Sequence, residues 1–406
     1  MFGFGNKQAQ RRQGPRGSFD VPLLLAALAL AAMGVVMVTS SSIAVADGSH
    51  VGAFYYLKKH LGFLAMGCLL AGIAMRTELK FVEKHSTTLL LLGIFLLLVV
   101  FVPGFGMRIN GARRWINLVV TGFQPVEAVK LILVAYLSSY LVRHREGVEY
   151  ELVGVLKPLG IAAMIAALLL LQPDFGSAML ILSTSAGMVW LAGARKRYLI
   201  GLAFVAVIVL AYVLLSKDYR VRRLTSFLDP FADPYNDGFQ LSQALIAVGR
   251  GEWTGVGLGS SVQKLFYLPE AHTDFILAVL AEELGLAGIV GVVGLYIVMV
   301  GRGLYLGLKG VELGQRFSGY VAYGISLMLG LQATVSIGVN LGVLPTKGLT
   351  LPLISSGGSS VMMTCAMVGV LLRATFEINR AEDARQSAVR QPAASVPTSA
   401  PIGGIA

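Results

Sequence analysis

Long apolar runs alternate with short polar segments from Val21 almost to the C-terminus of the chain. A run of about 17–25 apolar residues is long enough to cross a bilayer as a helix. The eighth run is longer, so the helix there is expected to tilt or break. The pattern predicts an all-α polytopic membrane protein with ten spans, at residues 21–42, 54–75, 87–103, 125–142, 158–171, 175–192, 198–215, 273–301, 317–340 and 353–375.

The polar segments divide the chain into one membrane domain and two tails. Residues 1–20 are rich in Gln, Gly and Arg, and residues 379–406 are rich in Ala, Pro and Ser, so both tails are expected to be disordered. The transmembrane domain then covers residues 21–378. Its longest polar segment, residues 216–272, lies between the seventh and eighth spans.

Basic residues predict how the chain lies in the membrane. Ten spans place both termini on one side, and the loops on that side carry Lys or Arg near the helix ends. Because such residues stay on the cytoplasmic side, both termini are predicted to be cytoplasmic and segment 216–272 to be a large periplasmic loop.

The composition agrees with a membrane protein and excludes several functions. Charged residues make up 14% of the chain, whereas about a quarter of a soluble protein is charged. The net charge of +11 suits anionic membrane lipids, and no basic-aromatic pattern indicates nucleic-acid binding. The absence of a GKS/T loop, CxxC and HExxH gives no indication of ATP hydrolysis or a zinc site. Cys68 and Cys365 lie in apolar runs and are interpreted as small buried hydrophobes.

Several arginines run against the charge bias, because they lie on the predicted outer side. One explanation is an anionic ligand such as a lipid-linked pyrophosphate, since a guanidinium group donates paired hydrogen bonds to phosphate oxygens. The other explanation is solvated surface Arg that pairs with nearby Asp. The arginines concerned are Arg108, Arg113, Arg114, Arg220, Arg222 and Arg223.

The unusual polar loops all fall on the same outer side. They are residues 104–124, 172–175, 216–272 and 340–352, and the polar stretch that ends at Asp274 joins them. This convergence predicts one outward-facing polar site that the long loop covers.

Asp274 stands at the start of the eighth span, within residues 265–285 (LFYLPEAHTDFILAVLAEELG). Ionisable groups at the mouth and in the body of a membrane helix are costly, and Glu282 and Glu283 follow inside the same helix. One interpretation is a helix N-cap followed by a polar contact between helices. The other is a catalytic carboxylate at the membrane surface.

Other polar residues near the predicted outer ends of the spans are candidates for a structural or a functional role. Glu127 and Lys130 are neighbours on one helix face, and they either pair with each other or support the base of a cavity. His272 is read as structural. Glu270 and Asp274, together with an incoming pyrophosphate, are able to share an ion of the Mg²⁺ type, which prefers oxygen ligands.

Two small-residue motifs are interpreted as structural. Gly255, Gly257 and Gly259 form a GxGxG run without the context of a dinucleotide site, so it predicts a turn with close backbone packing. The run of Ser and Gly at 355–360 has no His base beside it and is expected to let helices pack closely.

Taken together, the polar loops resemble the SEDS family (shape, elongation, division and sporulation proteins) over roughly residues 20–378. Ser356 and the basic N-terminal tail are similar to the division members rather than to the elongation members. The motifs that carry the resemblance are GARRWI (111–116), QPVEAVK (124–130), QPDFG (172–176), RLTSFLDP (223–230), the GVGLG and QKL run (255–265), LPEAHTDFI (268–276) and LPLISSGGSS (351–360).

The resemblance implies a peptidoglycan glycosyltransferase that polymerises lipid II into β-1,4 glycan strands by an inverting mechanism with undecaprenyl pyrophosphate as leaving group. The family's essential acid maps onto Asp274, and its paired Glu and Lys map onto Glu127 and Lys130. Arg108, Arg113, Arg114, Arg223 and His272 are the further substrate-binding candidates. No cofactor is certain, although a divalent cation (Mg²⁺ or Mn²⁺) is compatible with these residues.

The resemblance also implies a place and partners. The expected location is the cell inner membrane at the division septum. The expected partners are the class B penicillin-binding protein FtsI, which crosslinks the glycan, and the divisome membrane proteins FtsQ, FtsL, FtsB and FtsN. Two rival functions stay open: a transporter that flips lipid II, and a non-catalytic scaffold that recruits FtsI.

Overall fold

The structure, a computed structural model, describes residues 17–48, 51–109, 112–117, 122–215, 221, 225–236, 238–265, 267–345 and 348–390. Each of the ten predicted spans overlaps a long helix. These helices are α1 (Val21–Gly48), α2 (Tyr55–Arg76), α3 (Leu79–Val99), α4 (Pro125–Arg143), α6 (Leu152–Leu171), α7 (Phe175–Leu191), α8 (Lys196–Leu215), α11 (Ile276–Glu312), α12 (Arg316–Asn340) and α13 (Gly358–Arg390).

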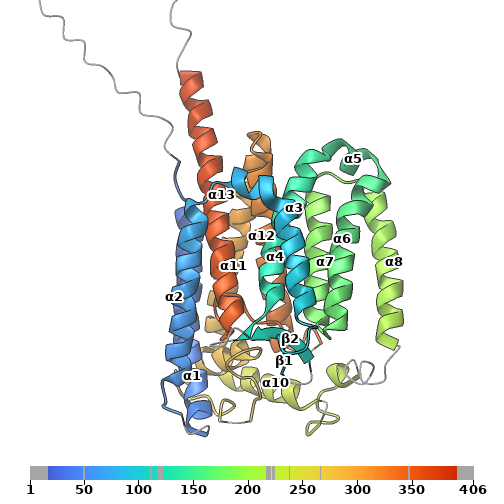
Figure 1. Cartoon of the computed structure of the whole chain (residues 1–406). Coiled ribbons are helices and arrows are strands. Elements are labelled where there is room, and N and C mark those ends of the chain that lie inside the picture. The colour runs from blue at the N-terminus through green and yellow to red at the C-terminus, as the bar shows by residue number, and fades with distance from the viewer. Residues whose placement is uncertain are drawn as a thin grey trace, which may run out of the picture.

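Length and composition make eight helices of the described chain able to cross a membrane, and α7 is a shorter apolar helix. The predicted all-α polytopic membrane fold is therefore confirmed. The long helices run side by side as one bundle (Figure 1). α4 and α12 lie at its centre, since most of their side chains are buried.

Glycines allow the close contact between α2 and α13. A Cβ at Gly369 would lie 2.6 Å from Ala71 Cα, and a Cβ at Gly67 would lie 2.9 Å from Cys365 Cβ. Small residues bring membrane helices together in this way. Cys365 is buried as expected, but the prediction is wrong for Cys68, which is exposed because its neighbour Gly67 is the residue that meets α13.

The bundle has two different ends. At one end a three-stranded antiparallel sheet of β1 (Gly106–Ile109), β2 (Ala112–Asn117) and β3 (Gly122–Phe123) lies near α10 (Phe239–Gly251). The short α5 (Arg145–Tyr150) lies at the other end, as does the end of α13 (Figure 1). Asn379 Nδ2 donates to Ser18 O at 3.0 Å, so the start of the described chain lies beside the last part of α13. This agrees with termini on one side and the long loop on the opposite side.

α11 breaks instead of tilting. Gly285 has φ 66° and ψ −162°, which interrupts the helix after residue 284. The predicted tight turn is confirmed beside this break, since Gly255 has φ +80° and a Cβ there would lie 2.1 Å from Glu283 O. Only glycine adopts such a backbone without strain.

Helix α13 continues past residue 378, where the membrane domain was predicted to end. It reaches Arg390, and an ion pair of 2.5 Å between Lys309 and Glu382 holds this extension to the end of α11. The tails predicted to be disordered are residues 1–20 and 379–406. Residues 379–390 are helical, as the end of α13, so the prediction is wrong for them. Residues 1–16 and 391–406 lie outside the described residues, and their disorder stays a prediction.

Candidate functional site

A cavity of about 840 Å³ lies at the outer end of the bundle, where the sheet, the start of α4 and the entrance to α11 come together. Three of the four polar loops predicted to converge contribute to its wall, and the fourth is tied to it through Arg114. The lining residues are Ala112, Arg114, Trp115, Gln124, Glu127, Ser177, Asn236, Phe239, Gln240, Pro269, Glu270, Thr273, Asp274, Phe275, Gly348, Leu349, Thr350, Ser356, Gly357, Ser359 and Ser360.

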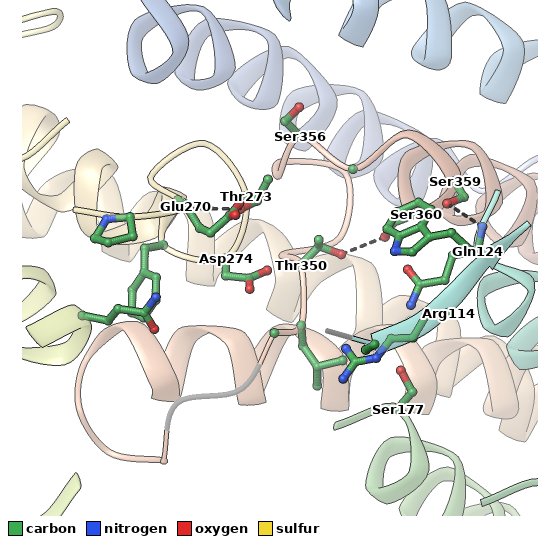
Figure 2. A pocket seen from close by; sticks show the side chains of 18 of the residues that line it. Arg114, Gln124, Ser177, Glu270, Thr273, Asp274, Thr350, Ser356, Ser359 and Ser360 are labelled. Carbon is green, nitrogen blue, oxygen red and sulfur yellow. Dashed lines mark hydrogen bonds between the residues drawn. The ribbon is translucent and has the colours of Figure 1, made fainter. Parts of the chain in front are cut away.

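Asp274 is held in this wall by its backbone. Asn340 Nδ2 donates to Asp274 O at 2.9 Å, and Ser355 Oγ donates to the carbonyl of Thr273 at 2.7 Å. The side chain is left out of these contacts and points into the cavity, opposite Arg114 (Figure 2). Within the described chain no residue donates a hydrogen bond to the Asp274 carboxylate.

The N-cap interpretation of Asp274 is wrong. The residue before α11 is Phe275, and the N–H of Ala278 in the first turn donates to Oδ1 of Asn340, from α12, at 3.0 Å. Because a side chain from another helix caps α11, the Asp274 carboxylate is available for chemistry.

The electrostatic surroundings of Asp274 favour its protonated form. The pKa of Asp274 is raised from 3.8 to about 7, first by burial and then by the negative charge of nearby Glu270. Arg114 acts in the opposite direction. A carboxyl group with a pKa near neutrality both accepts and returns a proton easily at physiological pH.

Glu270 is fixed on the same side of the cavity as Asp274. Its backbone has a φ of +56°, and its Oε2 accepts a hydrogen bond from Thr273 Oγ1 at 2.6 Å. Gly348 leaves room opposite, since a Cβ there would lie 3.1 Å from Asp274 Oδ2. Two carboxylates therefore share one open wall.

Glu127 and Lys130 pair with each other, as one interpretation predicted, and Glu127 also contributes to the floor of the cavity. Lys130 is fully buried and donates to Glu127 Oε1 at 2.8 Å and to Gln332 Oε1 at 3.1 Å. Gln332 in turn donates to Thr350 O at 2.9 Å, while Glu127 lines the cavity. The pair thus ties α4 to α12 and to the loop that follows α12.

The structure separates the predicted arginines. Arg114 lines the cavity, and its guanidinium donates to the carbonyls of Gln172, at 3.0 Å, and Pro173. Arg113, its neighbour on β2, is exposed and does not line the cavity, because successive residues of a strand face opposite sides. Arg108 is exposed too, and Arg223 lies outside the described residues.

A neutral polar wall faces the carboxylates, and sequence reasoning missed it. Ser359 Oγ accepts from the backbone N–H of Gln124 at 3.2 Å, and the hydroxyls of Thr350 and Ser360 are 2.8 Å apart (Figure 2). Only part of the 355–360 run serves helix packing: a Cβ at Gly358 would lie 2.7 Å from Phe63. The two pairs of serines, at 355–356 and 359–360, were the available signal.

His272 does not join the site. It lies outside the cavity lining, and its ring centroid is 5.3 Å from that of Tyr56. Burial lowers its pKa, and no described residue bonds its buried Nδ1. No group of three or more metal-ligating side chains occurs in the described chain. Of the three carboxylates that line the cavity, Glu127 is paired with Lys130, whereas Glu270 and Asp274 have no ion-pair partner among the described residues.

The fold and the site define a class: a multi-pass membrane protein with a carboxylate cavity at one membrane face. The comparisons identify the family. The family model described as "Cell cycle protein" (FTSW_RODA_SPOVE) matches residues 21–380. This chain belongs to that family, and the SEDS resemblance is confirmed.

Two curated relatives cover nearly the whole chain. "Probable peptidoglycan glycosyltransferase FtsW" of Xanthomonas oryzae pv. oryzae is 54% identical over 97% of this chain and 80% of its own length. The protein of the same name from Nitrosococcus halophilus is 49% identical over 95% of this chain and 98% of its own.

Two solved structures share the fold. One, titled "Structural coordination of polymerization and crosslinking by a peptidoglycan synthase complex", has a TM-score of 0.73, with 30% identity over 89% of this chain and 98% of that one. The other is the rod shape determining protein RodA of Thermus thermophilus, with a TM-score of 0.64 and 27% identity over 88% and 97% of the two chains.

Proposed function

We propose that this chain is a peptidoglycan glycosyltransferase that polymerises lipid II at the division septum. The observation that carries the proposal is the half-buried Asp274, whose pKa of about 7 and position in the cavity suit a general base. The names of the relatives agree with this activity.

Asp274 takes the proton from the 4-hydroxyl of the acceptor GlcNAc. The acceptor oxygen forms a bond to C1 of the donor MurNAc, and the bond from C1 to the undecaprenyl pyrophosphate breaks, so the electron pair leaves with the pyrophosphate. Attack from the face opposite the leaving group inverts C1 and gives the β-1,4 link. General-base catalysis of this kind contributes about 10²–10⁴-fold.

Arg114 is the strongest candidate for the leaving pyrophosphate. It lines the cavity, and the carbonyls of Gln172 and Pro173 hold its side chain in place. A preorganised cation stabilises developing negative charge more than a mobile one. Arg113, Arg108 and Arg223 have an outer role in binding the anionic substrate. A divalent cation, Mg²⁺ or Mn²⁺, would be held by the Glu270 and Asp274 carboxylates and would supply positive charge to the leaving group.

The solved relative described as a peptidoglycan synthase complex supports a partner that crosslinks the glycan. The proposed partner is FtsI, within a divisome that includes FtsQ, FtsL, FtsB and FtsN. The proposed site of action is the outer face of the inner membrane, where the cavity opens.

The test is polymerisation of lipid II by the purified full-length chain with FtsI. Asp274→Asn, which keeps the side-chain volume, should lower the rate by about 10²–10⁴-fold. Lipid II supplied already on the outer leaflet removes any need for flipping, so polymer formation there separates the enzyme from a flippase. A folded Asp274→Asn protein with normal polymerisation would point to the scaffold function instead.

A further inference from the structure

Two carboxylates that the proposed reaction does not use lie deep in the protein. Glu282 and Glu283 are fully buried at the end of the first segment of α11, residues 276–284, just before the break at Gly285. Neither residue lines the cavity. Asp274 precedes the opposite end of this same segment, so whatever fixes the segment also affects the cavity.

Both carboxylate oxygens of Glu282 accept hydrogen bonds from two donors each. Oε1 accepts from Arg250 Nη1 at 3.2 Å and from the N–H of Val262 at 3.1 Å. Oε2 accepts from Ser261 Oγ at 2.5 Å and from the N–H of Gln263 at 3.3 Å. All four donors come from the end of α10 and the loop that follows it.

Glu283 extends the same contact to α1. Lys264 Nζ lies 2.7 Å from Glu283 Oε1, and Ser40 Oγ donates to the same carboxylate at 2.6 Å. Lys264 Nζ also donates to Ser40 Oγ at 2.9 Å. We call these six residues the clasp: Ser40, Arg250, Ser261, Lys264, Glu282 and Glu283.

Backbone hydrogen bonds from segment 252–257 bridge the break. On one side of Gly285 the N–H groups of Val256 and Gly257 donate to the carbonyls of Glu282 and Glu283, at 2.9 and 3.1 Å. On the other side the N–H groups of residues 286 and 287 donate to the carbonyls of residues 252 and 253, at 2.9 and 3.1 Å. Since Gly285 interrupts the helix, this loop and the clasp take over the connection between its two segments.

The length of segment 276–284 makes this connection important for the cavity. Nine residues of helix span about 13 Å, so a tilt of about 5° at the break moves the far end by about 1 Å. A displacement of about 1 Å at a catalytic group is able to cost about 10²-fold in rate.

We propose that Glu282 and Glu283 are positioning residues, which fix the tilt of segment 276–284 through the clasp and so hold Asp274 at its working position. The proposal rests on the proposed function, in which Asp274 is the base. The ion pair between Lys264 and Glu283 is the best part of the clasp to test by substitution. Side chains alone bind the Glu283 carboxylate, whereas Glu282 also accepts hydrogen bonds from backbone N–H groups.

The test compares three proteins in the lipid II assay: wild type, Glu283→Gln, and the double variant Lys264→Met with Glu283→Gln. The double variant leaves no buried charge without a partner, so it keeps the fold if the single variant does not. Both should lower kcat by about 10–100-fold, with less than about a threefold change in KM. Because a displaced Asp274 is less buried, the acid limb of the pH–rate profile should move to lower pH.

Asp20→Asn is the matched control. Asp20 pairs with Arg302 at 2.5 Å at the opposite end of the bundle, without contact to segment 276–284. Its kcat and pH profile should match those of the wild type.

A wild-type kcat and pH limb in the double variant would overturn the proposal. The proposal would also fail if kcat of the variants fell only in proportion to the fraction of folded protein, while the acid limb of the pH–rate profile stayed in place. The clasp would then stabilise the fold without positioning Asp274. If Asp274→Asn is inactive while the clasp variants are normal, only this inference fails. If Asp274→Asn is fully active, the proposed function fails first.

Discussion

The carboxylates at the two ends of segment 276–284 differ in how far hydrogen bonds and ion pairs compensate their charge. Glu282 and Glu283 are fully buried, and each is surrounded by donors or paired with Lys264. Asp274 lies at the other end in a cavity wall, its carboxylate receives no hydrogen bond from the described chain, and its pKa is raised to about 7. Compensated carboxylates hold structure together, whereas an uncompensated one in a cavity is ready to exchange a proton.

The strongest test of this difference is to replace a carboxylate by the corresponding amide at each end of the segment. An Asp with an ordinary pKa of 3.8 in the unfolded chain and about 7 in the folded protein loses stability as pH rises between the two values. Asp274→Asn should therefore stabilise the protein above neutral pH by up to about 4 kcal/mol, and the gain should fade as pH falls below the folded pKa.

Glu282→Gln is the counterpart and should destabilise the protein by about 2–3 kcal/mol, since an amide cannot accept all four hydrogen bonds. Thermal unfolding in detergent at several pH values measures both changes. Equal signs for the two substitutions would contradict the distinction between the two ends.

Glu127, in the floor of the cavity, is a compensated carboxylate like Glu282 and Glu283, because it pairs with Lys130. Lys130→Met removes the cation beside Glu127 and should cost about 3–5 kcal/mol of stability, because it leaves a carboxylate without its partner. Adding Glu127→Gln should recover much of that loss. The recovery is read from unfolding temperatures of the single and double variants, and no recovery would mean that the two residues act separately.

The neighbours Arg114 and Arg113 test the cavity side. Arg114→Gln should lower kcat/KM for lipid II by about tenfold or more, as loss of a charge-assisted contact does. It should also move the acid limb of the pH–rate profile to higher pH, since Arg114 lowers the pKa of Asp274. Arg113→Gln, the matched control on the other face of β2, should change both much less. Equal losses would refute the division of roles.

Glu270→Gln should have the smallest effect. The Glu270 charge raises the pKa of Asp274, so its removal should move the acid limb to lower pH. Without added Mg²⁺ or Mn²⁺, the rate above that limb should change by less than about threefold, because Asp274 is already ionised there. An unmoved limb would show that the two carboxylates do not interact.

Hydrophobic pattern was enough for the membrane helices but not for the outer end. Each predicted span overlaps a helix, because a bilayer demands long apolar runs. The sheet was missed because β2 reads ARRWIN, whose charged side chains hide the strand. α10 was missed because it lay inside a segment judged by its polarity, although Leu241, Ala244 and Ala247 form a buried helical stripe.

The site was predictable where residue type decides the chemistry. Asp274, Glu127 and Arg114 lie in one cavity as the motifs indicated, but sequence does not tell which face of a strand Arg113 takes. Nor does it show that Asn340, from a different helix, caps α11 and leaves Asp274 without that task. Both facts depend on neighbours that are far apart along the chain.

The fully buried Lys130 also bears on the membrane as an electrical insulator. Its ammonium group donates hydrogen bonds to Glu127 and Gln332, so it has few donors left to bind incoming water. One and two turns further along α4, Leu133 and Leu137 are buried to 1% and 0% exposure. Apolar packing directly beneath the cavity therefore opposes the passage of protons, which would otherwise drain the voltage that the bilayer maintains.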